Sequence, residues 1–240
     1  MTSHEAVQQV IRMKQSAPLT LDRQRSALII VDVQRYFTEP GHAFTQMFER
    51  MVPGLTREYL DTVRTTVLPN VAKLVGCFRE RNLPVFYTAT GCQTGDGREL
   101  PKWLRDFDRA GQQVLGKRIW PDASDPSYAV DPAVAPRAGE FVVHKTSSGP
   151  LNSTKLDQTL HNLGVTGLVV CGLTTDVCVS QTARETADRG FDVVIAEDAC
   201  ATLSPELHRA ALEIFALAFG RTATTDAVAR HLEAAAAHVA

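Results

Sequence analysis

The chain has 240 residues, 44% of them hydrophobic and 22% charged, and its formal net charge is −2 at pH 7. We therefore expect one globular domain over residues 1–240, with residues 1–20 as an N-terminal helical extension. The charge excludes a strongly basic surface for nucleic acid or an anionic membrane, and no apolar run is long enough to span a bilayer. Five cysteines without a C-x-x-C pair favour a reducing cytoplasm over a disulfide framework, so we predict a cytoplasmic protein.

Six short apolar runs alternate with helical patterns along the chain. The runs predict strands over residues 26–31, 84–90, 141–145, 168–170, 192–196 and 220–224, the last of them at an edge of the sheet. Strands that alternate with helices indicate a three-layer α/β/α, doubly wound fold with a largely parallel six-stranded sheet.

The helical patterns follow the strands. They predict helices over residues 5–17, 56–82, 176–189 and 204–218, and a final alanine-rich helix from Asp226. We expect Pro69 to interrupt the second helix, and Asn152 or Ser153 to cap another that ends at Gly164. Residues 35–55 and 91–138 are predicted to be loops. The substrate determinants are expected in 38–55 and 91–138, and subunit contacts in the second loop.

Three reactive side chains stand at or just beyond the carboxyl ends of predicted strands. They are Asp32, Lys145 and Cys178. The strand ends of a doubly wound sheet meet at one crevice, so these side chains are expected to lie together. Cys178 also stands at a strand-to-helix turn, where free N–H groups and the helix dipole favour a thiolate over a thiol. Without such partners, Cys178 would be an inert buried cysteine.

The motifs of this chain resemble those of the isochorismatase-like cysteine hydrolase superfamily, which includes nicotinamidases, N-carbamoylsarcosine amidase and ureidoacrylate amidohydrolases. The matching segments are ALIIVDVQRYF at 27–37, the stretch from FVVHKTSSGP to IAEDAC at 141–200, and FGRTATTDAV at 219–228. The combination of D-x-Q, a lysine at a strand end and G-x-x-T-x-x-C-V carries the resemblance.

The resemblance implies a role for each member of a catalytic triad. Cys178 would be the nucleophile, Asp32 the general base and then acid, and Lys145 the cation that favours the thiolate and holds the carboxylate in place. The backbone N–H groups of Thr174 and Cys178 would form an oxyanion hole. A non-proline cis peptide is implied between Leu173 and Thr174.

Departures from the family motifs narrow the expected chemistry. The D-x-H motif that binds a metal in nicotinamidases is replaced by TATGCQTGDG at 88–97, so we expect neither a metal nor another cofactor. Ser147 and Ser148 stand where relatives carry an aromatic residue, which suggests a more polar wall. Candidate substrate-binding residues are Phe37, Gln34 and Asn152, although Phe37 is nearly as easily explained as a core residue.

The predicted activity is hydrolysis of a C–N bond in a small amide, carbamoyl or ureido compound, in a homodimer or homotetramer like those of its relatives. The alternatives are an isochorismatase-type ether hydrolase, a non-catalytic small-molecule-binding member of the fold, and a redox protein with Cys178 as a peroxidatic thiol. A Cys-His protease through His144 is disfavoured, because alternation points His144 away from Lys145. Cys92 lies near the expected crevice as a pocket residue or a bystander.

Overall fold

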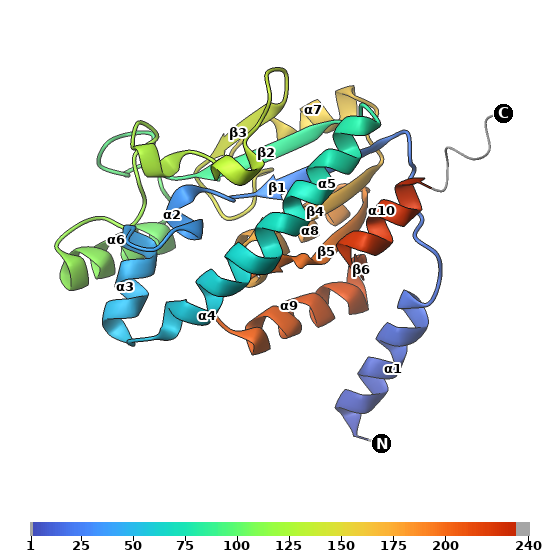
Figure 1. Ribbon diagram of the computed structural model, residues 1–240, viewed down its shortest axis with the longest axis horizontal. Coiled ribbons are helices and arrows are strands. Elements are labelled where there is room, and N and C mark those ends of the chain that lie inside the picture. Colours follow the sequence, from blue (N-terminus) through green and yellow to red (C-terminus); the bar gives the residue numbers. More distant parts are fainter. Residues whose placement is uncertain (1, 234–240) are drawn as a thin grey trace.

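The computed structural model describes residues 2–233 and contains one six-stranded sheet in which every pair of neighbouring strands is parallel. The strand order is β3-β2-β1-β4-β5-β6. The bounds are β1 Ser26–Val31, β2 Val85–Thr90, β3 Phe141–Lys145, β4 Gly167–Leu173, β5 Asp192–Ala201 and β6 Arg221–Ala223. The predicted α/β fold with a parallel six-stranded sheet is therefore confirmed (Figure 1).

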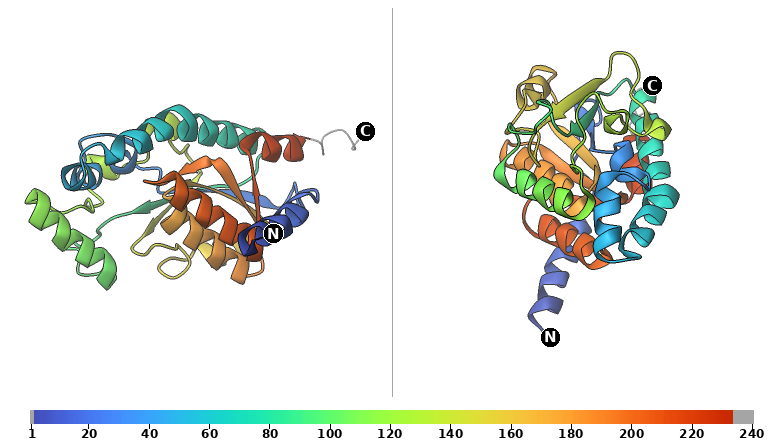
Figure 2. Two further views of the ribbon diagram at one scale, coloured as in Figure 1. Left: turned by 90° about the horizontal axis from the view of Figure 1, so that it is seen from below. Right: turned by 90° about the vertical axis from the view of Figure 1, so that its left-hand side faces the viewer.

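Helices cover both faces of the sheet, as Figure 2 shows. On one face, α5 (Leu68–Glu80) packs against β1 and β5, and α10 (Thr225–Glu233) packs beside it. On the other face lie α7 (Leu156–Asn162), α8 (Ser180–Asp188) and α9 (Pro205–Ala218). The N-terminal α1 (Ser3–Gln15) packs on α9, and its last residue is hydrogen-bonded to β6. The predicted helix after Asp226 is described only as far as Glu233, and its remaining residues lie outside the described part of the chain.

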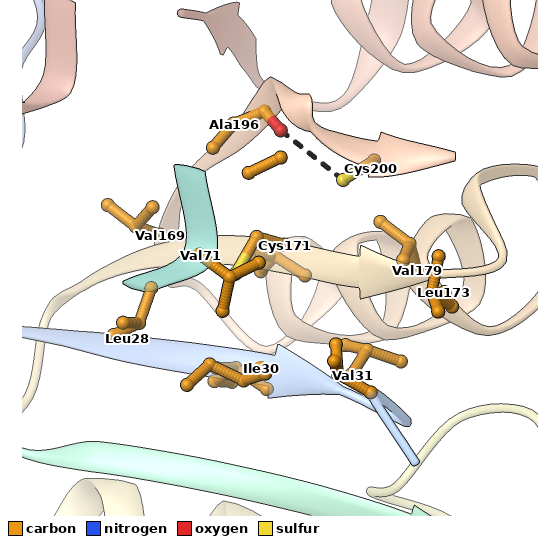
Figure 3. Packing of buried hydrophobic residues seen from close by; sticks show 14 of the residues in the cluster. Leu28, Ile30, Val31, Val71, Val169, Cys171, Leu173, Val179, Ala196 and Cys200 are labelled. Carbon is orange, nitrogen blue, oxygen red and sulfur yellow. Dashed lines mark hydrogen bonds between the residues drawn. The ribbon is translucent and has the colours of Figure 1, made fainter. Parts of the chain in front are cut away.

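The centre of the core is the contact between β1 and β4. Every residue of these two strands is buried, and the β-branched side chains fit the closely packed sheet. Figure 3 shows Ile30, Cys171 and Val71 of α5 in this cluster. Strand order reverses between β1 and β4, and such a switch point is where open α/β sheets bind their ligands.

Two segments that we predicted to be loops contain helices. Residues 35–55 hold α2 (Arg35–Thr38) and α3 (Ala43–Met51), while residues 91–138 hold α6 (Lys102–Leu115) and two short 3₁₀ turns, Pro126–Tyr128 and Pro132–Val134. Both predictions of irregular structure were wrong. The apolar side chains of α3 and α6 recur at helical spacing and pack on each other and around a cavity, so the periodicity that could have predicted both helices is present in the sequence.

Several helix and strand boundaries also differ from the predicted ones. The helical region from 55 to 80 is divided into α4 (Leu55–Thr62), a π-helical turn (Val63–Val67) and α5, and Pro69 lies in the first turn of α5, in keeping with the expected interruption. The helix α7 begins later than predicted, and the Thr154 hydroxyl accepts from the N–H of Leu156 at 3.1 Å. Strand β5 continues to Ala201, beyond the predicted end at residue 196, and so includes Cys200.

Gly172 allows β4 to lie against β1 just before the turn that carries Cys178. Its φ of +119° is one that side chains rarely permit, and an added Cβ would meet the carbonyl oxygen of Val31 at 2.1 Å. The residue type is thus set by the close approach of two backbones.

Replacing Gly172 with alanine should lower the free energy of unfolding by more than about 2 kcal/mol, because the backbone strain and the clash add up. Gly76→Ala is the matched control, since a Cβ there meets nothing within 4 Å and alanine favours the helix by up to about 1 kcal/mol. Urea denaturation of both variants tests the difference. Equal stability of Gly172→Ala and the wild type would contradict it.

Candidate active site

The structure brings together the three reactive residues that the sequence singled out. Asp32 follows β1, Lys145 ends β3 and Cys178 lies in the turn after β4. The Lys145 Nζ atom is 2.8 Å from Asp32 Oδ2 and 3.6 Å from Cys178 Sγ. The two charged side chains are fully buried and Cys178 is 7% exposed. One ammonium group therefore contacts both the carboxylate and the sulfur atom.

Two threonines of β2 hold the Asp32 carboxylate, and sequence reasoning did not find them. The Thr88 hydroxyl donates to Oδ1 at 2.7 Å, and the Thr90 hydroxyl donates to Oδ2 at 3.1 Å. Their spacing of two residues puts both on one face of the strand, which is the signal that could have found them. Asp32 itself has a φ of +50°, a conformation that Asp tolerates better than most residues. Backbone and hydroxyls together direct the carboxylate at Lys145.

The Lys145 ammonium is charged in spite of its burial. Burial acts to lower its pKa, but Asp32 and Cys178 outweigh it, and the pKa lies above the ordinary lysine value. The Nζ atom also donates to the carbonyl oxygen of Ser147 at 2.9 Å. A buried ammonium group with three such partners has little freedom to move.

The electrostatics of Cys178 differ from the expectation of a resting thiolate. Burial raises the pKa of the Cys178 thiol to about 12, and Asp32 adds to this, against the lowering effect of Lys145. The sulfur atom therefore carries a proton at neutral pH. The lysine charge is already matched by Asp32, so its lowering effect on the pKa of the thiol does not offset burial.

The turn that carries Cys178 is held from two neighbouring elements. A π-helical turn, Thr175–Val179, leads into α8, and the peptide bond Leu173–Thr174 is cis, which confirms the bond implied by the resemblance. Asp176 Oδ1 accepts from the Thr202 hydroxyl at 2.7 Å. The Thr175 hydroxyl and His208 Nδ1 of α9 are hydrogen-bonded at 2.8 Å. Burial lowers the pKa of His208 although Asp176 acts to raise it, so the imidazole is neutral at pH 7.

A cavity of about 210 Å³ is lined in part by Cys178. Its walls are mainly aromatic and apolar, and the serines after β3 add a small polar part. The lining residues are Phe37, Phe44, Phe48, Thr90, Trp103, Leu104, Phe107, Trp120, Ser147, Ser148, Thr174, Asp176, Val177, Cys178, Thr202 and Leu203. The volume fits a small molecule.

The three candidate substrate-binding residues have different positions. Phe37 lines the cavity. Gln34 is fully buried outside the lining, and its amide bonds the backbone of Thr90 and Tyr128, so the structure gives it a role in folding. Asn152 donates to Glu185 and does not line the cavity. The expectation that Gln34 and Asn152 contact substrate is therefore not supported by their positions, because protein groups bond both side chains.

Two other side chains lie outside the cavity lining. Cys92 is buried, and its sulfur atom accepts from Arg118 Nη2 at 2.7 Å. His144 points away from Lys145, and its Nδ1 atom is 2.9 Å from the Tyr128 hydroxyl oxygen. Within residues 2–233, no three His, Cys, Asp or Glu side chains are grouped to hold a metal ion, and no helix is long and apolar enough to cross a membrane.

Comparison with known proteins identifies relatives. The model of the isochorismatase domain family matches residues 26–227. The chain is 31% identical over 217 residues to ureidoacrylate amidohydrolase RutB of Methylobacterium radiotolerans, with 85% of this chain and 78% of that protein covered. It is 26% identical to N-carbamoylsarcosine amidase of Arthrobacter, with 88% and 72% covered. A cysteine hydrolase structure from Pseudomonas syringae pv. phaseolicola has a TM-score of 0.73 and 27% identity, and covers 92% of this chain and 99% of its own.

The raised pKa of Cys178 predicts that its thiol does not ionise near neutral pH. The difference in thiolate ultraviolet absorbance between the wild type and Cys178→Ser should stay flat from about pH 6 to about pH 9, since the acid form of a group persists below its pKa. Spectrophotometric titration of the two proteins measures this. A titration step below about pH 8 in the wild type alone would contradict it.

Proposed function

The chain belongs to the isochorismatase-like hydrolase family, and we propose that it is a cysteine amidohydrolase acting on the C–N bond of a small amide, carbamoyl or ureido compound. The observation that carries the proposal is the contact of Lys145 with both Asp32 and Cys178, the last of which lines a cavity. Amidases among the relatives support the same class of reaction.

In the first step, Cys178 attacks the carbonyl carbon of the substrate. The thiol proton passes to Asp32 as the S–C bond forms, so no resting thiolate is needed. The carbonyl oxygen becomes an oxyanion, and the backbone N–H groups of Thr174 and Cys178 are its proposed donors. Both residues line the cavity.

Collapse of the adduct then breaks the C–N bond. Protonated Asp32 gives its proton to the leaving nitrogen, and ammonia or an amine departs from a thioester-type intermediate. Water attacks this intermediate while Asp32 accepts a proton from it. The S–C bond breaks, the proton returns to the sulfur of Cys178, and the acid product leaves. The net change is one water consumed and one C–N bond cleaved.

Lys145 keeps the charge balanced throughout this cycle. Before attack, its ammonium group pairs with the Asp32 carboxylate at 2.8 Å. After attack, Asp32 is protonated and the negative charge is on the carbonyl oxygen of the adduct. The same ammonium group, whose Nζ atom lies 3.6 Å from Cys178 Sγ in the resting geometry, is then the counter-charge of the adduct. The triad and the bound substrate together thus carry no net charge in either state, which limits the electrostatic cost of proton transfer in a buried site.

Cys178→Ala should reduce ammonia release by at least about 10³-fold, because the nucleophile is lost. The substrates would be a panel of primary amides, carbamoyl compounds and ureido acids, with ammonia as the readout. Cys77→Ala is the control, since Cys77 lies on α5, away from the cavity. Undiminished release by Cys178→Ala would refute the assignment of the nucleophile. No release by the wild type from any compound would favour a non-catalytic, small-molecule-binding member of the family.

Lys145→Met should abolish activity and lower the free energy of unfolding by about 3–5 kcal/mol, since it leaves the buried Asp32 carboxylate without its counter-charge. Combining it with Asp32→Asn removes both charges, and the double variant should regain most of this stability while remaining inactive. Urea denaturation and the ammonia assay measure the two effects separately. A single variant that is as stable as the double one would contradict the pairing.

A further inference from the structure

The cavity above Cys178 has an aromatic wall drawn from separate segments of the chain. Phe37 of α2 and Phe44 of α3 have ring centroids 4.7 Å apart. The ring centroid of Phe107 of α6 lies 6.1 Å from that of Phe48 and 6.0 Å from that of Trp120. Because each ring packs on the next, the wall is continuous and has few polar atoms to offer a ligand.

The cavity has a negative group and lacks a free positive one. Among its lining residues, which all fall in the described part of the chain, Asp176 is the single carboxylate, and none is Lys, Arg or His. The nearby ammonium group of Lys145 is fully buried and paired with Asp32. A negatively charged substituent of a ligand therefore finds no uncommitted cation in the cavity walls.

Asp176 is fixed at this wall by its neighbours. Its Oδ1 atom accepts from the Thr202 hydroxyl, and Thr202 also lines the cavity. Asp176 stands two residues before Cys178 in the same π-helical turn, so its position is tied to that of the nucleophile. A carboxylate in a ligand bound at Cys178 would meet this like charge among aromatic rings, where water screens it poorly.

We propose that this cavity selects substrates whose acyl substituent is uncharged and apolar, and that Asp176 is the specificity-determining residue that rejects carboxylates. This inference rests on the proposed amidohydrolase function. An apolar substituent gains from burial against the rings. A carboxylate loses its hydration and gains no partner, so repulsion and desolvation act together against acidic amides.

Two matched pairs of primary amides test the selection. Each pair exchanges a methyl group for a carboxylate. The first pair is 4-methylbenzamide and 4-carbamoylbenzoate, and the second is butanamide and succinamate. We expect kcat/KM, measured by ammonia release from the wild type, to favour the uncharged member by at least about 100-fold. A ratio near one, or a preference for the carboxylate in both pairs, would overturn the inference.

The role of Asp176 is tested by the change in this ratio. Asp176→Asn keeps an oxygen for the Thr202 hydroxyl and removes the charge, so the preference for the uncharged member should fall by at least about tenfold. Asp188→Asn removes the same charge from the exposed end of α8, outside the cavity, and should leave the ratio unchanged. Asp176→Ala is the second variant, should the first not fold. An unchanged ratio in the soluble variant would refute the role of Asp176.

A binding measurement separates failure of this inference from failure of the proposed function. If the wild type releases no ammonia from the four amides, the same compounds are titrated calorimetrically into Cys178→Ala. Tighter binding of the uncharged members would uphold the selection even though hydrolysis had failed. Equal binding of both members, tighter binding of the carboxylates or no binding of the uncharged amides would overturn it.

Discussion

The buried ion pair between Asp32 and Lys145 is the constraint on which the site depends. Burial of two charged groups is tolerated only if they pair with each other and their remaining hydrogen-bonding capacity is satisfied. Here Thr88, Thr90 and the carbonyl oxygen of Ser147 supply those bonds. The partners come from β1, β2 and β3 or from the segment just after a strand, so the register of three adjacent strands determines the geometry of the ion pair.

The same pair explains the state of the nucleophile. A lysine beside a cysteine usually favours the thiolate, but here its charge is matched by a carboxylate, and burial keeps the thiol protonated. In the proposed reaction, the proton moves between sulfur and carboxylate while the ammonium group stays in contact with both. A site of this kind activates its nucleophile only when a substrate accepts the electron pair, which protects the thiol from ionising in the empty cavity.

The cavity depends on a different part of the chain from the triad. The triad follows strands of the central sheet, whereas the aromatic wall comes largely from α3, α6 and the segment after α6. The catalytic residues of the proposed reaction and the apolar wall of the cavity are thus placed on separate elements. Asp176 belongs to both regions, since it lies in the turn of Cys178 and lines the cavity together with the aromatic residues.

The sequence by itself determined the strands, their alternation with helices and the family, because these follow from local apolar patterns and from motifs within a few residues. It also indicated that Asp32, Lys145 and Cys178 would meet, since parallel strand ends share one edge of the sheet. It missed α3 and α6, whose apolar residues face a cavity and each other, and it assigned Gln34 and Asn152 to substrate although protein groups bond them. Only the tertiary structure decided the protonation of Cys178, the threonine support of Asp32 and the charge of the cavity. These depend on burial and on contacts between distant segments, which no local pattern contains.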